Sequence, residues 1–446
     1  MISTKSIEIP KPSFSRILIV LATISSVLLI NWFYFYDIAE TYRYLNFNPK
    51  NEFNILGRFF FGFMACFPSL WLTTKTYRPS QAFLWIFYFI VYIPAVSFAP
   101  CTSLTSNFEI TVLLLSLVSS ILILHILSHI PLVSVSKPAT SAPIFWSIVI
   151  FSLLLLLIYF SVSNHLSLSM PNLLDVYPLR KSFAAFLESS PKIVSYWVST
   201  QANAINPLIL ICGLVHKRPL LIFFGIFGQF FIFVCSGMKS VLFSIVFILI
   251  VFALLKRKGN SFARFLSMGV AFSLAAIVFV GFFIDTSLLS AIFVRRVFVV
   301  PGIVTGFYHD FFSSHPLVLL SDGILSPFVP YEFPFDRGVP KLIGDTFIGK
   351  EDFHVNVHFL SNSFMHFGYL GMLFFSFIWG LISWFFDSLS RNQPLFLSGT
   401  FFCTISFSLA NSGLLTSLLS HGILIAVLLF YFLPQHVVRA KEDGHA

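Results

Sequence analysis

Long apolar runs recur along nearly the whole chain and are separated by short polar segments. The runs are close to the ~20 residues that cross the hydrocarbon core of a membrane as a helix. They are continuous and do not alternate with polar residues, which favours helices over a β-barrel. The pattern predicts an all-α polytopic membrane protein with about 12 transmembrane helices, at 14–36, 56–74, 82–99, 109–131, 143–163, 194–214, 218–235, 238–255, 262–284, 360–386, 395–412 and 414–433.

The first apolar run is expected to stay in the protein as a helix. It follows Lys5, Lys11 and Arg16, as the core of a signal peptide would. However, it is longer than such a core, and no small-residue cleavage site follows it.

Composition agrees with a membrane protein, because 57% of the residues are hydrophobic and only 10% are charged. A soluble domain has roughly a quarter of its residues charged. The net charge of +9 comes mostly from short loops, so we do not expect nucleic-acid binding. The five cysteines show no metal-ligand spacing or close pair, which gives no sign of a disulfide framework or a zinc site.

The connecting segments alternate in charge along the chain. Cations gather before the first run and around Lys75, Lys137, Lys217, Lys256, Arg391 and Arg439. By the positive-inside rule this side is the cytoplasm, which places both termini there. The outer side then receives 37–55, 100–108, 164–193, 236–237, 285–359 and 413. Two of these segments keep cations that topology disfavours, and we expect those cations to bind a ligand: Arg180, Lys181, Lys192, Arg295, Arg296, Arg337, Lys341 and Lys350.

The outer segment 285–359 divides the chain into three parts. At about 75 residues it is far longer than ordinary connections, and such loops are usually functional or disordered. It is rich in Phe, Tyr, Val and Pro, so we expect it to pack on the bundle. The predicted organisation is about nine spans in 1–284, a long periplasmic loop with an interfacial helix in 285–359, and the last spans with a cytoplasmic tail in 360–446.

Arg295 and Arg296 precede Pro301, which suits the first turn of a helix. Ile303, Phe307 and Phe311 then recur at four-residue spacing, and this predicts an amphipathic helix on the outer membrane surface. A helix N-terminus beside two guanidinium groups is suited to bind a pyrophosphate. The alternative is that the two arginines only contact lipid headgroups at the end of a span.

His309 and Asp310 are candidates for taking or orienting the proton of a sugar hydroxyl. The alternative is that they form part of a polar helix face. Arg180 offers further positive charge in the preceding outer segment, or else belongs to a solvated loop pair with Lys181. Lys239 opens an almost wholly apolar span, where a cation is costly unless it is paired or reaches the interface.

Several common catalytic motifs are missing from the sequence. There is no Walker loop, G-x-G-x-x-G, H-E-x-x-H or G-x-S-x-G pattern. There is also no Asp-x-Asp to hold a metal with a nucleotide sugar. We therefore expect no metal and no cofactor, and a donor other than a soluble sugar nucleotide.

Four stretches together resemble the bacterial Wzy-type O-antigen polymerases, mainly their long periplasmic loop. They are Arg295-Arg296-x-Phe-x-x-Pro301-Gly with Tyr308-x-Asp310-Phe-Phe and Ser314-His-Pro316, Asp175-Val-Tyr-Pro-Leu-Arg180, Ser236-Gly-Met-Lys239-Ser, and Asn362-x-Phe-Met-His-Phe-Gly368-Tyr-Leu-Gly371. The likeness covers about 175–425 and includes the many-helix layout.

The resemblance implies a metal-independent, inverting, class C glycosyltransferase-like enzyme of the inner membrane. It would polymerise oligosaccharide repeat units linked to undecaprenyl pyrophosphate at the periplasmic face, together with a chain-length regulator. Departure of the lipid pyrophosphate builds negative charge, which fixed cations stabilise. Arg295, Arg296, Arg180 and Lys239 are the candidates for this role, with Asp310 or His309 as base.

Two other functions fit the same pattern. An O-antigen ligase also has a large periplasmic loop and a lipid-linked donor, but it passes the glycan to lipid A core. A flippase or transporter of lipid-linked glycan fits the helix count, although transporters place charges at the membrane midplane and show paired broken helices. Here the spans are nearly free of charge and the two halves of the chain differ.

Overall fold

The computed structural model describes residues 13–51, 55–163, 171, 176–257, 261–284, 289–323, 325–350 and 353–434. Within these residues all regular structure is helical. Ten helices are long and apolar enough to cross a membrane, and three shorter apolar helices accompany them. The chain is therefore a multi-pass helical membrane protein. Each of the twelve predicted runs coincides with one of these helices.

The helices follow one another in three groups. The first comprises α1 (Phe14–Phe33), η1 (Tyr34–Ile38), α2 (Ala39–Thr41), η2 (Arg43–Leu45), α3 (Ile55–Cys66), η3 (Phe67–Leu70), α4 (Pro79–Phe87), η4 (Tyr88–Tyr92), α5 (Ile93–Thr102) and α6 (Asn107–Leu127). The second comprises α7 (Ala142–Val162), α8 (Tyr177–Ser189), α9 (Lys192–Thr200), η5 (Gln201–Ile205), α10 (Asn206–His216), α11 (Pro219–Ser236), α12 (Lys239–Leu255) and α13 (Phe262–Gly281). The third comprises η6 (Ser290–Val299), α15 (Val300–Ser314), η7 (Ser326–Phe328), α16 (Val339–Ile348), α17 (Phe359–Leu389), α18 (Leu395–Ser406), η8 (Phe407–Ala410), α19 (Leu414–Leu419) and α20 (Ile423–Phe432).

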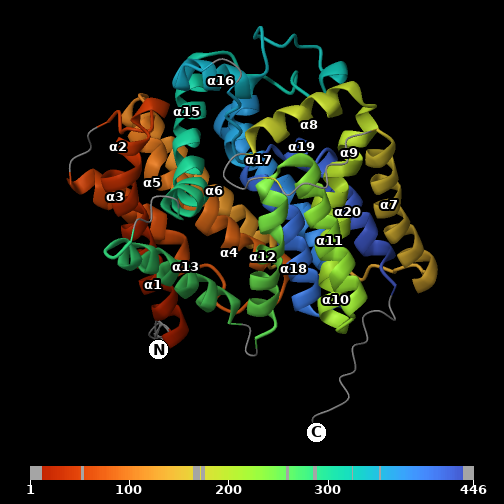
Figure 1. Cartoon of the computed structure of the whole chain (residues 1–446). Helices are drawn as coiled ribbons and strands as arrows, with labels where there is room; N and C mark the ends of the chain where they lie inside the picture. Colours follow the sequence, from red (N-terminus) through yellow and green to blue (C-terminus); the bar gives the residue numbers. More distant parts are fainter. Residues whose placement is uncertain are drawn as a thin grey trace, which may run out of the picture.

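Neighbours in space are often distant in sequence. α15 packs along α5, α13 along α1, and α17 along α6, while α12 contacts α18. Figure 1 shows α1 to α6 with α13 and α15 on one side of the bundle, and α7 to α12 with α18 to α20 on the other. η6 and α15 therefore lie within the first side, next to helices from the beginning of the chain.

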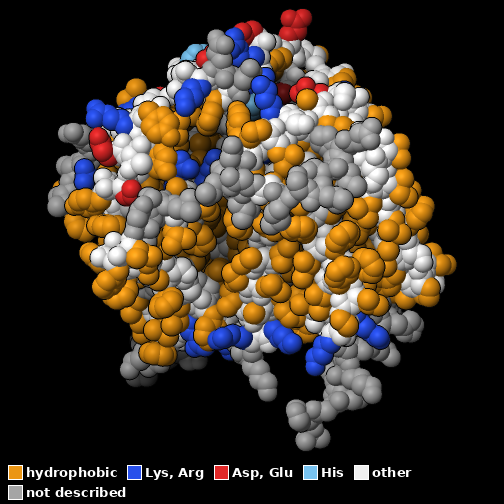
Figure 2. Space-filling view, viewed as in Figure 1, with side chains coloured by type: hydrophobic (Ala, Val, Ile, Leu, Met, Phe, Trp, Pro, Cys, Tyr) orange, Lys and Arg blue, Asp and Glu red, His pale blue; other side chains and the backbone are white. Residues whose placement is uncertain are grey.

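One end of the bundle is held together by cations that cap loops and helix ends. Arg16 donates to the carbonyl oxygen of Ser69 at 3.0 Å, Arg78 to that of Ile130 at 2.7 Å, and Lys137 to that of Phe430 at 3.2 Å. Figure 2 shows Lys and Arg side chains along this edge of the molecule. We call this end of the bundle the basic end. The other end, where α1 and α5 finish, is called the opposite end. Cations that the sequence places in alternate segments thus share one end of the bundle.

The predicted long loop contains a helix that the apolar pattern did not show. η6 and α15 form one helix of 25 residues, Ser290–Ser314, long and apolar enough to cross a membrane. α15 begins at Val300 with Pro301 in its first turn, as the sequence predicts, but the π-helix η6 runs directly into it, so Arg295 and Arg296 lie inside the helix and not before it. The π-helical turns of η6 precede Pro301, and such turns accommodate a residue that lacks the N–H of a regular helix.

The predicted amphipathic pattern is not seen in the burial of α15. Ile303 and Phe307 are buried, but so are Thr305 and His309 on the other faces. The α15 part of the helix is thus buried on several faces, as expected inside a bundle, whereas Ile292 and Phe293 of η6 are exposed. Gly302 allows the close approach to α5, because a Cβ atom there would collide with the carbonyl group of Pro94.

α17 is broken near its start. Phe367 and Gly368 have non-helical backbone angles, with φ of 61° at Gly368, a left-handed value that glycine adopts without strain. The short first part is capped by His358, which accepts from the N–H of Ser361 at 3.4 Å. The Nε2 atom of His358 lies 2.7 Å from the Thr305 hydroxyl, which ties this first part to α15.

Candidate functional site

Arg295 lies where η6 meets the opposite end of α1. Its guanidinium group stacks over the ring of Tyr42, 4.0 Å from the ring centre. Its Nε atom donates to the carbonyl oxygen of Ala291 at 3.3 Å. Stacking on an aromatic face leaves the remaining N–H groups of an arginine free to bind an anion in the plane of the group.

Arg180 contacts the turn between α11 and α12, just before Lys239. Arg180, on α8, donates through Nε to the carbonyl oxygen of Gly237 at 3.1 Å, and Lys239 follows two positions later at the start of α12. The charge of Arg296 interacts with the charges of both Arg180 and Arg295. The structure thus brings three predicted cations together from α8 and η6, and Lys239 lies two positions after Gly237, which Arg180 contacts. We call these four residues the cation cluster.

The cation cluster has no ion pair among the described residues. The ion pairs in the described part of the chain involve other cations. Arg43 pairs with Glu40, and Arg337 pairs with Asp336 and Asp345. The nearest acid to η6 that the hydrogen bonds reveal is Asp37, which accepts from Ser290. Asp175, which precedes Arg180 in the resembling stretch, lies outside the described residues. An excess of unpaired positive charge attracts and binds anions.

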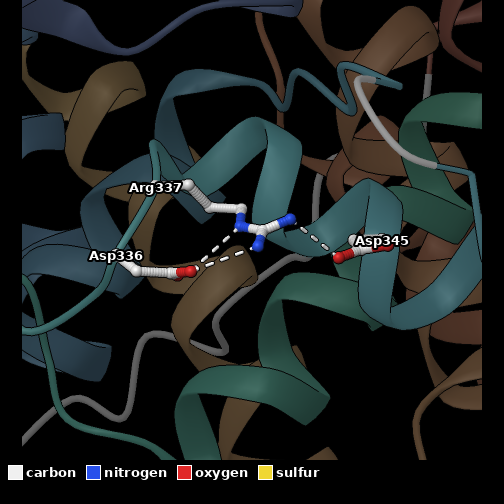
Figure 3. A network of polar contacts seen from close by, with 3 residues as sticks. All are labelled: Asp336, Arg337 and Asp345. Carbon is white, nitrogen blue, oxygen red and sulfur yellow. Dashed lines mark hydrogen bonds and ion pairs between the residues drawn. The ribbon is translucent and has the colours of Figure 1, made fainter.

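Arg337 shows the contrast. It was one of the outer cations expected to bind a ligand, but its guanidinium group lies 3.1 Å from Asp336 and 2.9 Å from Asp345 (Figure 3). These contacts connect the segment before α16 to α16 itself. A guanidinium group already paired with two carboxylates has little charge left for a ligand.

Asp310 lies near the C-terminal end of α15, away from Arg296 in η6. Its Oδ1 atom accepts from the N–H of Leu104 at 2.9 Å, just beyond α5. Burial lowers the pKa of Lys50, and the charge of Asp310 acts in the opposite direction, so the two groups are neighbours. The ammonium group of Lys50 also lies over the rings of Phe307 and Phe347, at 5.6 and 4.8 Å.

Sequence reasoning did not single out Lys50. The sequence feature that could have identified Lys50 is the one used for Arg180, a cation in a segment predicted to lie on the outer side. Lys50 was passed over because its segment has no pair of adjacent arginines like Arg295 and Arg296.

His309 is buried and uses both ring nitrogens within the protein. Its Nδ1 atom lies 3.2 Å from the Ser103 hydroxyl and 3.3 Å from the Thr105 hydroxyl. Its Nε2 atom lies 2.9 Å from the hydroxyl of Tyr369, which in turn donates to the carbonyl oxygen of Glu109. This arrangement suits a neutral imidazole protonated at Nε2. His309 therefore holds the 103–105 turn, whose Leu104 N–H holds Asp310.

The cation cluster and Asp310 are separate in this structure. Fourteen positions along one helix separate Arg296 from Asp310, which corresponds to about 20 Å. The sequence placed all six candidate residues in one site. The structure instead groups the arginines with each other, and Asp310 with Lys50 and the His309 network.

Among the described residues, no group of three or more His, Cys, Asp or Glu side chains is arranged to hold a metal ion. Comparison with known proteins adds no further guidance. No family model matches the chain, and neither the curated proteins nor the solved structures contain a match.

Proposed function

We propose that this protein is a glycosyltransferase that polymerises oligosaccharide repeat units carried on undecaprenyl pyrophosphate into O-antigen or a related surface polysaccharide. It would act in the bacterial inner membrane, with both termini cytoplasmic and the opposite end of the bundle facing the periplasm. The reaction needs no metal or cofactor. A chain-length regulator is the expected protein partner.

The observation that carries the proposal is the cation cluster. Arg180 comes from α8 and Arg295 and Arg296 from η6, and the charge of Arg296 is repelled by the other two, while none of the three forms an ion pair among the described residues. Holding like charges together has a cost that an anionic ligand recovers. A lipid pyrophosphate carries several negative charges and sits at a membrane surface, so it meets both requirements.

The chemistry follows from the leaving group. A hydroxyl oxygen of the acceptor unit attacks the anomeric carbon of the donor, and the bond from that carbon to the pyrophosphate oxygen breaks. The lipid pyrophosphate leaves with the bonding electrons, and the hydroxyl proton passes to solvent water or to an oxygen of the departing pyrophosphate. Guanidinium groups placed at the developing charge stabilise this transition state by several kcal/mol.

Asp310 fits a supporting role better than that of a base at the cation cluster. A base has to reach the reacting hydroxyl within hydrogen-bond distance, and Asp310 lies about 20 Å along the helix from Arg296. A half-buried carboxylate beside Lys50 is suited to bind sugar hydroxyls. We therefore assign Asp310 to holding the glycan, and His309 to positioning Asp310.

The test is a lipopolysaccharide gel of the host with the gene deleted and then restored. Polymerisation predicts collapse of the ladder to core plus a single repeat unit. Complete loss of glycan from the core would indicate ligation or flipping instead, and an unchanged ladder would exclude all three. Arg295→Ala and Arg296→Ala should reproduce the deletion, and Arg337→Ala serves as a matched control. A normal chain length in both cluster variants would contradict the assignment.

A further inference from the structure

An apolar groove lies on the surface of the bundle between α1 and α13, which pack together at the lower left of Figure 1. Its volume is about 510 Å³. The large residues at its edges are well exposed, with Leu28 at 65% and Phe272 at 75%. Three of its lining residues are small, and they keep the space between the larger side chains open: Ser25, Ala271 and Ala275.

The groove lies near the middle of the span that α1 begins, and the cation cluster lies beyond the end of that span. Ser25, Leu28 and Leu29 fall near the middle of the 28-residue span Phe14–Thr41. Tyr42, on which Arg295 stacks, follows Leu29 by thirteen positions, or about 20 Å along a helix. Half of the hydrocarbon core is about 15 Å. A lipid with its head at the cluster would therefore reach the groove with its tail.

Exposed aromatic rings follow the groove residues along the chain on both sides of the groove. Trp32 of α1 and Tyr36 of η1 are exposed, and their rings are 6.0 Å apart. Beyond the groove on α13, Phe279 and the nearby Phe283 are exposed as well. These rings extend an apolar surface from the groove towards the opposite end of the bundle.

We propose that the groove between α1 and α13 holds the apolar tail of a polyprenyl pyrophosphate whose head is bound by the cation cluster. The proposal rests on the proposed function. Charge favours this lipid over an ordinary phospholipid. Asp37 lies at this end of α1, and a head with a single negative charge would offset little of the four cations. A pyrophosphate matches the excess positive charge.

The energetic role of the groove is selectivity. Lipid tails are as apolar as the protein surface, so no hydrophobic gain drives the tail into the groove. The gain comes from close packing against a preformed shape. We therefore expect a preference for long prenyl chains of about tenfold, which corresponds to ~1.4 kcal/mol.

The experiment measures dissociation constants for the full chain in detergent micelles. The probes are undecaprenyl pyrophosphate, farnesyl pyrophosphate and inorganic pyrophosphate, with phosphatidylglycerol as competitor. Ala271→Phe and Ser25→Phe fill the groove from its two walls. Ala253→Phe is the matched control, because Ala253 is an exposed residue of α12 outside the groove.

The expected result is that each groove variant binds undecaprenyl pyrophosphate about tenfold more weakly. Binding of inorganic pyrophosphate should not change, and the control should behave like wild type. If the groove variants keep the wild-type preference for the long chain, the tail lies elsewhere and only this inference fails. Equal competition by phosphatidylglycerol would also overturn it, because the groove would then hold ordinary lipid. If neither wild type nor Arg296→Gln binds any pyrophosphate probe, the proposed function fails too.

Discussion

Arg180 on α8 and Arg296 on η6 are close enough for their positive charges to interact, although a large part of the chain separates them in sequence. Neither forms an ion pair within the described residues. Two guanidinium groups held together without a carboxylate are a feature of binding sites, since folding alone gains nothing from their proximity.

The repulsion predicts an effect on stability. Arg296→Gln should raise the melting temperature slightly, by the equivalent of about 0.5 kcal/mol, because one of the repelling charges is gone. Inorganic pyrophosphate should raise the melting temperature of wild type, as any ligand of the native state does, but not that of the variant. Differential scanning fluorimetry in detergent measures both effects.

Arg337→Gln is the control for this prediction, since Arg337 is paired with Asp336 and Asp345. Its melting temperature should stay the same or fall, and the response to pyrophosphate should remain. A lower melting temperature in Arg296→Gln with a normal response to pyrophosphate would mean that Arg296 is structural.

His309 and Asp310 should separate into different roles. His309→Ala removes a buried ring with bonds to Ser103, Thr105 and Tyr369, so it should destabilise the protein by about 1–3 kcal/mol. Asp310→Asn keeps an acceptor for the N–H of Leu104 and should leave the melting temperature nearly unchanged. Both variants should shorten the polymer on a lipopolysaccharide gel. A His309→Ala protein with wild-type stability and no polymer would show that His309 acts directly in the reaction.

His358 predicts loss of stability in mild acid. It is buried at the start of α17, where burial lowers its pKa to about 3. The unfolded chain binds a proton at this residue below about pH 6.5, whereas the folded protein does so only near pH 3. Between these values the unfolded state holds more protons, so stability falls as the pH falls, by at most about 1.4 kcal/mol per unit.

The measurement is the melting temperature at pH 7 and pH 5 for wild type and His358→Gln. The variant retains polar groups opposite Thr305 and Ser361 but does not titrate. Its melting temperature should therefore depend less on pH over this range. The same loss between pH 7 and pH 5 in both proteins would assign the effect to other groups.

Gly302 should tolerate no larger side chain. A Cβ atom there would collide with the carbonyl group of Pro94, so Gly302→Ala has to move α15 away from α5. Such overpacking costs typically 1–3 kcal/mol. Gly269→Ala on α13 is the matched control, because a Cβ atom there meets open space. It should be neutral or stabilising, since alanine favours a helix over glycine by up to about 1 kcal/mol. Equal melting temperatures for the two variants would contradict the close packing of α15 on α5.

The apolar pattern predicted twelve of the apolar helices, because an apolar run of about 20 residues is most stable as a helix in the hydrocarbon core of a membrane. It missed Ser290–Ser314 because Arg295, Arg296 and Pro301 interrupt the run. Those interruptions are accommodated only by tertiary structure, through the stacking of Arg295 on Tyr42 and the π-helical turns before Pro301. A hydropathy analysis of one short segment at a time detects neither the stacking nor the π-helical turns.

The candidate site was predictable in part for a similar reason. Cations on the outer side are unusual in sequence, and the structure places Arg180, Arg295 and Arg296 together as expected. The sequence analysis placed Arg295 and Arg296 before the helix, whereas η6 and α15 are continuous, so Asp310 was assigned to the same site although it lies fourteen positions beyond Arg296 along one helix. The role of His309 depends on Ser103 and Tyr369, residues from distant segments that no local pattern connects to it.

The π-helical stretch Ser290–Val299 gives this helix a place where a change in chain length can be absorbed. A wide turn of this kind holds one residue more than a regular turn. Deleting Val297 would convert a wide turn into a regular one, so the loss is taken up within η6 and the helix on either side keeps its orientation. The side chains inside the stretch, Arg295 among them, would be redirected. The anion-binding groups thus lie in a part of the helix whose length can change while α15 keeps its packing on α5.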